Sequence, residues 1–375
     1  MSTNIKITSL VCVLPKRRSS GMVLSSATLA IIVLFGGLVA NEMVESNSQA
    51  HYLSKLSQQL SFSVEPGMNP TPVYPKAGPY DKRLGYVDLP RLIDRLNNVG
   101  FTVASQARLS DKMHDIVNQG YFPIFKEKSD AGLAIYDWQN QLVWQRRYPE
   151  HGYETFAQIP SVVVNTLLYI ENRNLLDSKH PNRNPAVEWG RLIKVSKDAL
   201  INSVLDRQKK LAGGSTLATQ IEKYRHAEGG MTHSPRDKIR QMVSAALRAY
   251  LNGEDTISSR QDVVLSYINT VPLAARKGYG EINGIGDGLS AWYGTDFSHA
   301  NNVLNATPPR FSMAEEEQAT VYKQILSLFL AQRRPTFYLN HPNALNDLVD
   351  TYLGLLVSNN VIEWEFANLV RSVKL

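Results

Sequence analysis

The stretch GGSTLATQIEKYRH, from Gly213 to His226, joins two glycines and a Ser-Thr pair to a polar run with helical spacing. A turn of this kind can bind an anion at a helix N-terminus, form a plain turn with Ser215 as the N-cap, or contribute one wall of a catalytic cleft. It is not a P-loop, because no Gly-Lys-Ser/Thr sequence follows at the required spacing. On this stretch alone, the three interpretations stay open.

The composition of the chain is that of an ordinary globular protein. It has 375 residues, 43% of them hydrophobic and 20% charged, and this length suits roughly two domains of about 100–200 residues. The net charge of +6 is compatible with nucleic acid, an anionic membrane surface or a phosphorylated substrate and does not choose among them. With the single cysteine Cys12, no intrachain disulfide can form and a structural zinc site is not expected.

An uncharged, mostly apolar run covers residues 21–40 and follows the basic residues Lys16, Arg17 and Arg18. About 20 such residues span the core of a bilayer as a helix. The positive flank predicts a cytoplasmic tail over residues 1–20 and places the rest of the chain outside. A signal peptide cleaved near residues 46–50 is the competing prediction. The run is longer than a typical signal core, which favours an anchor.

The residues between this run and the helical half are predicted to form a linker and a small module. Residues 41–79 are polar and then rich in proline, which is typical of a linker. Residues 80–150 predict a small α/β module, or an elaboration of the domain that follows. It would contain a helix over 88–100 and a hairpin over 131–149.

From about Ile159 onward, helical patterns dominate the sequence. Ser234, Ser259 and Ser312 are each followed three residues later by Asp or Glu, so each is predicted to cap the N-terminus of a helix. The region lacks an alternation of strand and helix patterns, which argues against a dinucleotide-binding fold. The prediction is therefore a mainly α domain over residues 151–375.

Glu171 directly follows the apolar run VVVNTLLYI and should end a largely buried helix. A carboxylate in such a place can serve as a general acid or base. Taken alone, the position is also that of an ordinary helix-end glutamate beside Arg173.

Together these segments resemble the peptidoglycan glycosyltransferase domain, glycosyltransferase family 51, of penicillin-binding proteins and monofunctional transglycosylases. The stretch from Gly213 to Lys223 closely matches the family motif Gly-Gly-Ser-Thr-Ile-x-x-Gln-x-x-Lys. Residues 171–180 resemble the motif that begins with the catalytic glutamate. Residues of this chain resemble the later family motifs in the right order: 237–241, 263–269, 280–294 and 331–335. The resemblance covers about Ile159 to Ile362.

The resemblance implies a lysozyme-like helical domain that polymerises lipid II into glycan strands at the outer face of the bacterial inner membrane. Glu171 would be the general base that takes the proton from the acceptor sugar's hydroxyl while undecaprenyl pyrophosphate leaves. Cationic side chains should stabilise the charge that develops on this leaving group. The predicted substrate-binding residues are Gly214, Ser215, Thr216, Gln220, Lys223, Lys238, Gln241 and Asn269.

The resemblance also sets expectations about partners. These are lipid II, the nascent glycan, the membrane and cell-wall synthesis proteins, and nucleic acid is not among them. No protein-bound metal is predicted, and a divalent cation, Mg²⁺ or Mn²⁺, at the pyrophosphate stays open. Leu200, Ile201, Val204 and Leu205, followed by basic residues, suit either a membrane-dipping element or a core stripe.

The chain departs from the family at several motif positions. Gln241 stands where the family has its second essential glutamate, Asn172 replaces an aspartate, and Leu265 replaces the glutamate of the fourth motif. Glutamine can form hydrogen bonds but carries no charge. Glu222 and Glu281 are the candidates for a replacement carboxylate. Three functions therefore stay open: a divergent transferase that uses Glu171 alone, a non-catalytic scaffold that binds lipid II or glycan, and a lysozyme-like lytic enzyme.

Overall fold

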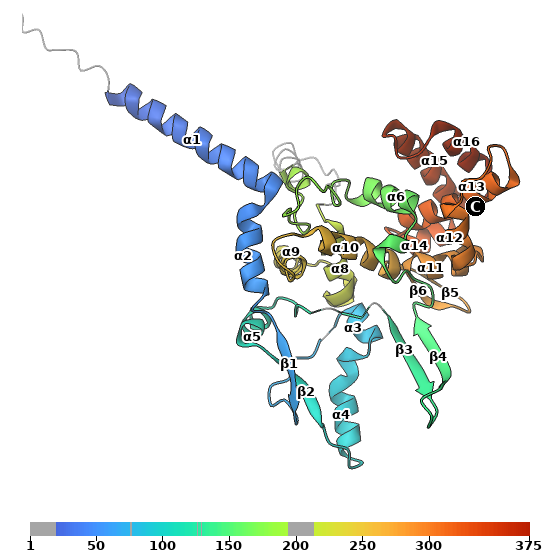
Figure 1. Ribbon diagram of the computed structural model, residues 1–375, viewed down its shortest axis with the longest axis horizontal. Helices are drawn as coiled ribbons and strands as arrows, with labels where there is room; N and C mark the ends of the chain where they lie inside the picture. The colour runs from blue at the N-terminus through green and yellow to red at the C-terminus, as the bar shows by residue number, and fades with distance from the viewer. Residues whose placement is uncertain (1–19, 76, 126, 129, 194–213) are drawn as a thin grey trace, which may run out of the picture. The chain divides into compact units, whose positions relative to one another are not determined.

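The computed structural model describes residues 20–75, 77–125, 127–128, 130–193 and 214–375 (Figure 1). It divides into two compact units, Met1–Glu45 and Ser46–Leu375. Three sequence predictions fall outside the described residues: most of the cytoplasmic tail, the glycine at 213, and the apolar element over residues 200–205.

The described part of the first unit is one helix, α1 (Ser20–Glu45). Its segment Thr28–Glu45 is long and apolar enough to cross a membrane. The predicted span over residues 21–40 lies within α1, which agrees with the sequence interpretation. That α1 crosses a membrane, and in which direction, stays a prediction.

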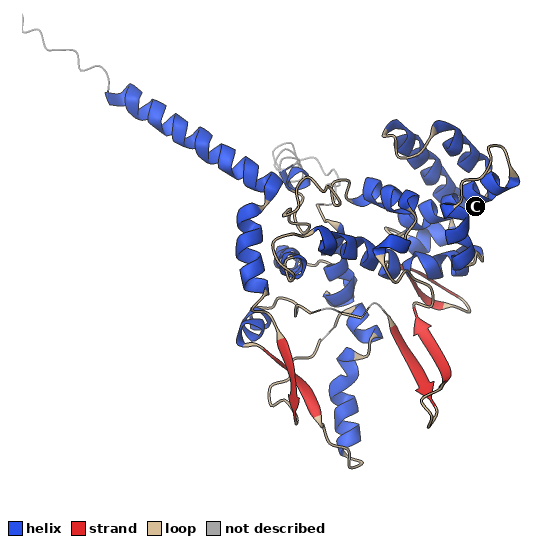
Figure 2. Cartoon of the chain, viewed as in Figure 1, coloured by secondary structure: helices blue, strands red, loops and turns tan. Residues whose placement is uncertain are grey.

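The second unit is mainly α, as predicted (Figure 2). Its described strands form three separate antiparallel pairs. These pairs are β1 (Phe62–Pro66) with β2 (Ser105–Leu109), β3 (Ala131–Tyr136) with β4 (Leu142–Tyr148), and β5 (Pro272–Arg276) with β6 (Gly280–Asn283).

The helices before residue 171 are α2 (Asn47–Ser57), α3 (Pro79–Arg83), η1 (Tyr86–Asp88), α4 (Leu89–Asn97), α5 (Asp111–Asn118), η2 (Phe156–Gln158) and α6 (Ser161–Glu171). The later ones are α8 (Leu217–His226), η3 (Glu228–Gly230), α9 (Pro235–Ala249), α10 (Ile257–Thr270), α11 (Gly284–Gly288), η4 (Leu289–Tyr293), α12 (Phe297–Asn305), α13 (Met313–Ala331), α14 (Pro335–Asn340), α15 (Pro342–Ser358) and α16 (Trp364–Ser372).

The main hydrophobic core surrounds α13. Every residue of this helix from Val321 to Ala331 is buried, as is typical of a helix that is enclosed on all sides. Helices α6, α11, α12, α15 and α16 pack around it. The predicted N-cap Ser312 accepts a hydrogen bond from the backbone of Glu315, which confirms the start of α13.

The segments before residue 150 pack on the helices that follow. Helix α3 lies against α8 and α2 lies against α9, and Met113 and Ile116 of α5 share a small core with Leu247 of α9. The predicted helix over 88–100 and the predicted hairpin are present as α4 and β3–β4. These segments therefore support α8 and α9.

The predicted cap of α10 is wrong. The helix begins at Ile257, two residues before Ser259. The backbone N–H of Ile257 donates to Asp255 Oδ1 at 2.7 Å, and the hydroxyl of Thr256 donates to the carbonyls of Pro181 and Arg183. Tertiary contacts of Thr256 fix this helix start. The spacing of Ser259 and Asp262 in the sequence cannot predict these contacts.

Candidate active site

Glu171 is the last residue of α6 and only 4% exposed. Its helix is apolar and packs against α13, so the carboxylate is held at the rim of the main core. One carboxylate oxygen, Oε2, accepts a hydrogen bond from Gln220 Nε2 at 3.0 Å. A buried carboxylate with directed partners is a typical general base or acid.

The turn before α8 is capped by Thr216, not by Ser215. Thr216 Oγ1 accepts from the backbone of Thr219 at 3.3 Å, and Thr219 Oγ1 accepts from the backbone of Thr216 at 3.0 Å. This reciprocal capping box satisfies two N–H groups of the helix start. Ser215 and Gly214 are half-buried just before it, and the Ser215 hydroxyl is left for another partner.

That partner is Lys238, which reaches from α9 and donates to Ser215 Oγ at 2.7 Å. Burial, and then the like charge of Lys223, lowers the pKa of Lys238 to about 8. Burial also lowers the pKa of Lys223, while Glu171 opposes that effect. The two lysines are therefore close enough to interact, and Lys223 also interacts with Glu171.

Gln220 and Lys223 lie three residues apart on α8 and so share one face of the helix. The structure thus brings together five predicted residues: Glu171, Ser215, Gln220, Lys223 and Lys238. They form a site with one carboxylate, two ammonium groups and two neutral polar groups. Such a site can hold an anionic group beside a base.

Gln241 and Asn269 have other partners. Gln241 is 1% exposed and its amide forms hydrogen bonds with the hydroxyl of Thr232 at 3.0 and 3.1 Å. Asn269 accepts from the backbone N–H of Tyr153 at 2.9 Å and donates to its carbonyl at 2.7 Å. Asn269 therefore fixes the backbone before α6, and its binding role stays a prediction.

Two residues that the sequence interpretation did not assign to the site also contact Glu171. Gln332 Nε2 and Arg333 Nη2 each donate to Glu171 Oε1 at 3.1 Å. They lie between α13 and α14, in the segment that resembles the closing family motif. Gln332 and Arg333 follow Glu171 by 161 and 162 residues in the sequence. A local sequence pattern therefore cannot predict these contacts.

The comparison with known families agrees with this arrangement. A family model described as Transglycosylase matches residues 139–347, more than half of the 375 residues. The chain belongs to the transglycosylase family. Among curated proteins, none matches its sequence. The match confirms the resemblance to glycosyltransferase family 51 that the motifs indicate.

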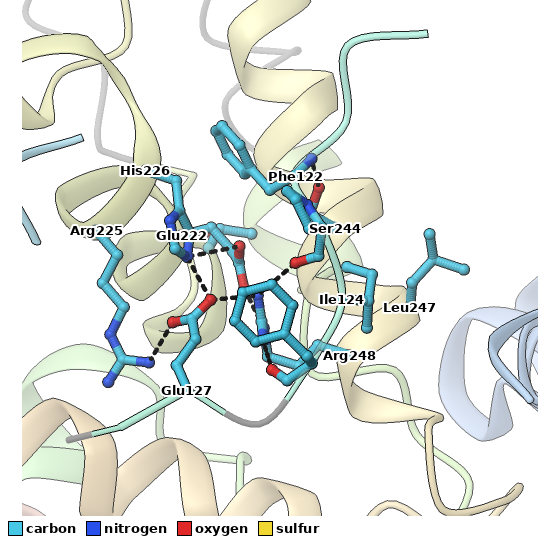
Figure 3. A network of polar contacts seen from close by, with 12 residues as sticks. Phe122, Ile124, Glu127, Glu222, Arg225, His226, Ser244, Leu247 and Arg248 are labelled. Atoms are coloured by element: carbon cyan, nitrogen blue, oxygen red, sulfur yellow. Dashed lines mark hydrogen bonds and ion pairs between the residues drawn. The ribbon is translucent and has the colours of Figure 1, made fainter. Parts of the chain in front are cut away.

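Within this transglycosylase domain, the candidate replacement carboxylates lie elsewhere. Glu222 is on the face of α8 opposite Gln220, where Arg248 Nε contacts its Oε1 at 2.7 Å (Figure 3). Glu281 pairs with Arg83 and its side chain is 72% exposed. Neither side chain contacts Glu171, Lys223 or Lys238 through the ion pairs that the described residues form, so neither takes the place of the glutamate that Gln241 replaces.

The buried network around Glu222 instead holds α8 in place (Figure 3). His226 lies between Asp81 at 3.0 Å and Glu127 at 2.8 Å. Glu127 also pairs with Arg225 at 3.2 Å and Arg248 at 3.1 Å. Segments before residue 130 are thereby tied to the far side of the helix that carries Gln220 and Lys223.

The side chains at the candidate site do not fit a metal ion held by the protein. In the described ranges, no group of three or more His, Cys, Asp or Glu side chains could hold one. At the site, Glu171 is already paired with Arg333, and the amide of Gln241 carries no charge. A cation at the pyrophosphate would depend on phosphate oxygens, so no catalytic step is assigned to it.

Proposed function

We propose that the chain is a membrane-anchored peptidoglycan glycosyltransferase that polymerises lipid II-type substrates, with Glu171 as the general base. One observation carries the proposal: the buried carboxylate of Glu171 accepts from Gln220 on the helix face that also carries Lys223. These residues come from the two segments that most resemble the family motifs. The transglycosylase family match supports the same reaction.

The proposed chemistry is a displacement at the anomeric carbon of the donor sugar. Glu171 takes the proton of the acceptor hydroxyl, and that oxygen forms a bond to the anomeric carbon. The bond from this carbon to the pyrophosphate oxygen breaks, and negative charge moves onto the leaving group. Lys223, and Lys238 held at the turn by Ser215, are suited to stabilise this charge.

We also propose that the chain is anchored in the membrane. Helix α1 would be the anchor, with residues 1–20 in the cytoplasm and the second unit on the outer side of the bacterial inner membrane. A lipid-linked substrate is restricted to the bilayer surface, so an anchored enzyme meets it without diffusing through solution. Nascent glycan and cell-wall synthesis proteins would then be the partners.

A second candidate is a scaffold that binds lipid II or glycan without catalysis. Gln241 favours it, because this buried amide bonds to Thr232 where the family has an essential carboxylate. A lytic enzyme is less well supported. The general acid of a lytic enzyme must present a proton to the substrate, whereas Gln220, Gln332 and Arg333 all donate to Glu171 and so bind its carboxylate as an acceptor.

The test is glycan polymerisation from labelled lipid II by the full chain in detergent, beside Glu171→Gln and Gln241→Glu. We expect polymer from the wild type and a loss of about 10²–10⁴-fold in Glu171→Gln. Polymer from Gln241→Glu alone would support a scaffold that lost catalysis at one position. If no variant makes polymer while lipid II still binds, the transferase proposal is wrong.

A further inference from the structure

The carboxylate of Glu171 is covered on its exposed side by an arginine. The Glu171 side chain is 5% exposed, whereas that of Arg333 is 61% exposed. Gln220 and Gln332, which also bind the carboxylate, are half-buried. Arg333 is thus the most exposed of the three partners of Glu171.

The three donors leave little room for an acceptor sugar. A carboxylate offers about four lone-pair positions. Gln332 and Arg333 occupy Oε1, and Gln220 occupies one position of Oε2. A general base must approach the proton it takes to within hydrogen-bond distance, about 2.6–3.2 Å between heavy atoms. One position of Oε2 stays open, but the carboxylate is buried, so a partner that covers it must move before a substrate hydroxyl can approach.

Arg333 is the partner best able to leave. It lies in the short connection between α13 and α14, and its long, flexible side chain extends along the surface. Rotation about its side-chain bonds moves the guanidinium into water without moving the backbone. Gln220 lies within α8 and Gln332 is the C-cap of α13, and both side chains are half-buried, so they are less free to move into water than Arg333.

We propose that Arg333 is a gate on Glu171: it pairs with the carboxylate in the resting protein and must swing away before an acceptor can bind. This inference rests on the proposed function for the role of Glu171. Its structural part, the cover over the carboxylate, does not depend on which reaction follows. Arg333 is a positioning residue because it acts through Glu171.

The chain supplies a matched control. Arg334 is the next residue and is also exposed, but its guanidinium lies over the ring of Phe337, 4.1 Å from the centroid. Substitution of Arg334 removes the same charge from the same connection without uncovering Glu171.

The first measurement is the rate at which a water-soluble carbodiimide couples glycinamide to Glu171, followed by peptide mass spectrometry. The full chain in detergent is compared with Arg333→Ala and Arg334→Ala, with Glu171→Gln as the blank. We expect Arg333→Ala to react up to about fivefold faster, the upper end of the range for loss of a partly exposed ion pair, and Arg334→Ala to react like the wild type. Equal rates in all three proteins would overturn the gate. Arg333→Gln, which keeps most of the side-chain volume, repeats the test if Arg333→Ala does not fold.

Polymerisation of lipid II by the same variants separates this inference from the proposed function. We expect Arg333→Ala to lower the KM for lipid II. Loss of polymer in Arg333→Ala, with normal polymer from Arg334→Ala, would overturn the gate, because Arg333 would then serve the chemistry. Faster labelling without polymer from any variant would leave the gate standing and reject the transferase.

Discussion

Gln220 of α8 donates to Glu171 of α6 at 3.0 Å and so joins two motif segments that are 49 residues apart. This bond turns the carboxylate toward the helix face that carries Lys223. One neutral side chain therefore orients the Oε2 side of the base.

Loss of this bond should slow polymerisation without unfolding the protein. In Gln220→Ala, Glu171 keeps its charge but loses the donor on Oε2, and a misplaced base costs roughly 10–100-fold in rate. Polymer yield per minute from labelled lipid II measures the effect. Gln145→Ala, on the exposed strand β4, is the control and should retain the wild-type rate. Unchanged activity in Gln220→Ala would show that this bond does not orient the base.

The rate should fall as the pH rises through about 8. Burial and the nearby Lys223 lower the pKa of Lys238 to about 8, so its ammonium group is present below that pH and lost above it. A neutral amine cannot stabilise a departing pyrophosphate. Rate measurements over about pH 6–10 should show this decline, and Lys238→Arg should remove it because arginine stays charged. A decline that persists in Lys238→Arg would assign it to another group.

Because of the buried network at His226, the stability of the folded protein should fall at alkaline pH. Burial by itself would lower the pKa of His226, but Glu127 and Asp81 outweigh burial and raise it to about 9. Because the folded pKa is raised, the stabilisation is full below the ordinary value of 6.5 and is lost as the pH rises through about 9. The loss is on the order of 3 kcal/mol.

Thermal unfolding of the detergent-solubilised chain between about pH 6 and 10 measures this dependence. His226→Gln should be less stable at neutral pH and should lack the decline that the wild type shows. His233→Gln replaces an exposed histidine and should keep it. If the wild type and His226→Gln lose stability in parallel, the network does not carry the pH dependence.

Arg260 should stabilise the folded protein by holding the loop that follows Glu171. This side chain is 1% exposed; its guanidinium donates to the carbonyls of Leu175, Asp177, His180 and Pro181 at 3.0–3.2 Å. In Arg260→Met these buried and part-buried carbonyls lose their donors, which should cost about 3–5 kcal/mol. The unfolding midpoint should drop by several degrees, while Arg236→Met, at an exposed position, should leave it unchanged.

Several parts of the fold follow from local sequence. Ser234 accepts from the backbone of Asp237 and Ser312 accepts from Glu315, so both predicted helix starts are confirmed. A serine N-cap needs only residues within one turn, and this makes it readable from the sequence. The same holds for Gln220 and Lys223, because helix geometry alone puts residues three apart on one face.

Local rules were wrong where distant contacts compete with them. The cap of α8 is Thr216, so the interpretation of Ser215 as the N-cap, which the sequence left open, does not hold; the Ser215 hydroxyl accepts from Lys238 of another helix. The start of α10 is set by contacts of Thr256 with Pro181 and Arg183. In both cases a hydroxyl near the helix start binds a partner far along the chain and does not cap the helix.

The sequence by itself determined the mainly α fold, the apolar N-terminal helix, the family, and Glu171 at the end of a buried helix. Each depends on residue type and short-range spacing. Only the tertiary structure brought Gln332 and Arg333 to Glu171 and placed Glu222 in a buried ion network. The packing of α13 beside α6 creates the first of these contacts. Such packing follows from how whole apolar faces meet, and no short stretch of sequence encodes it.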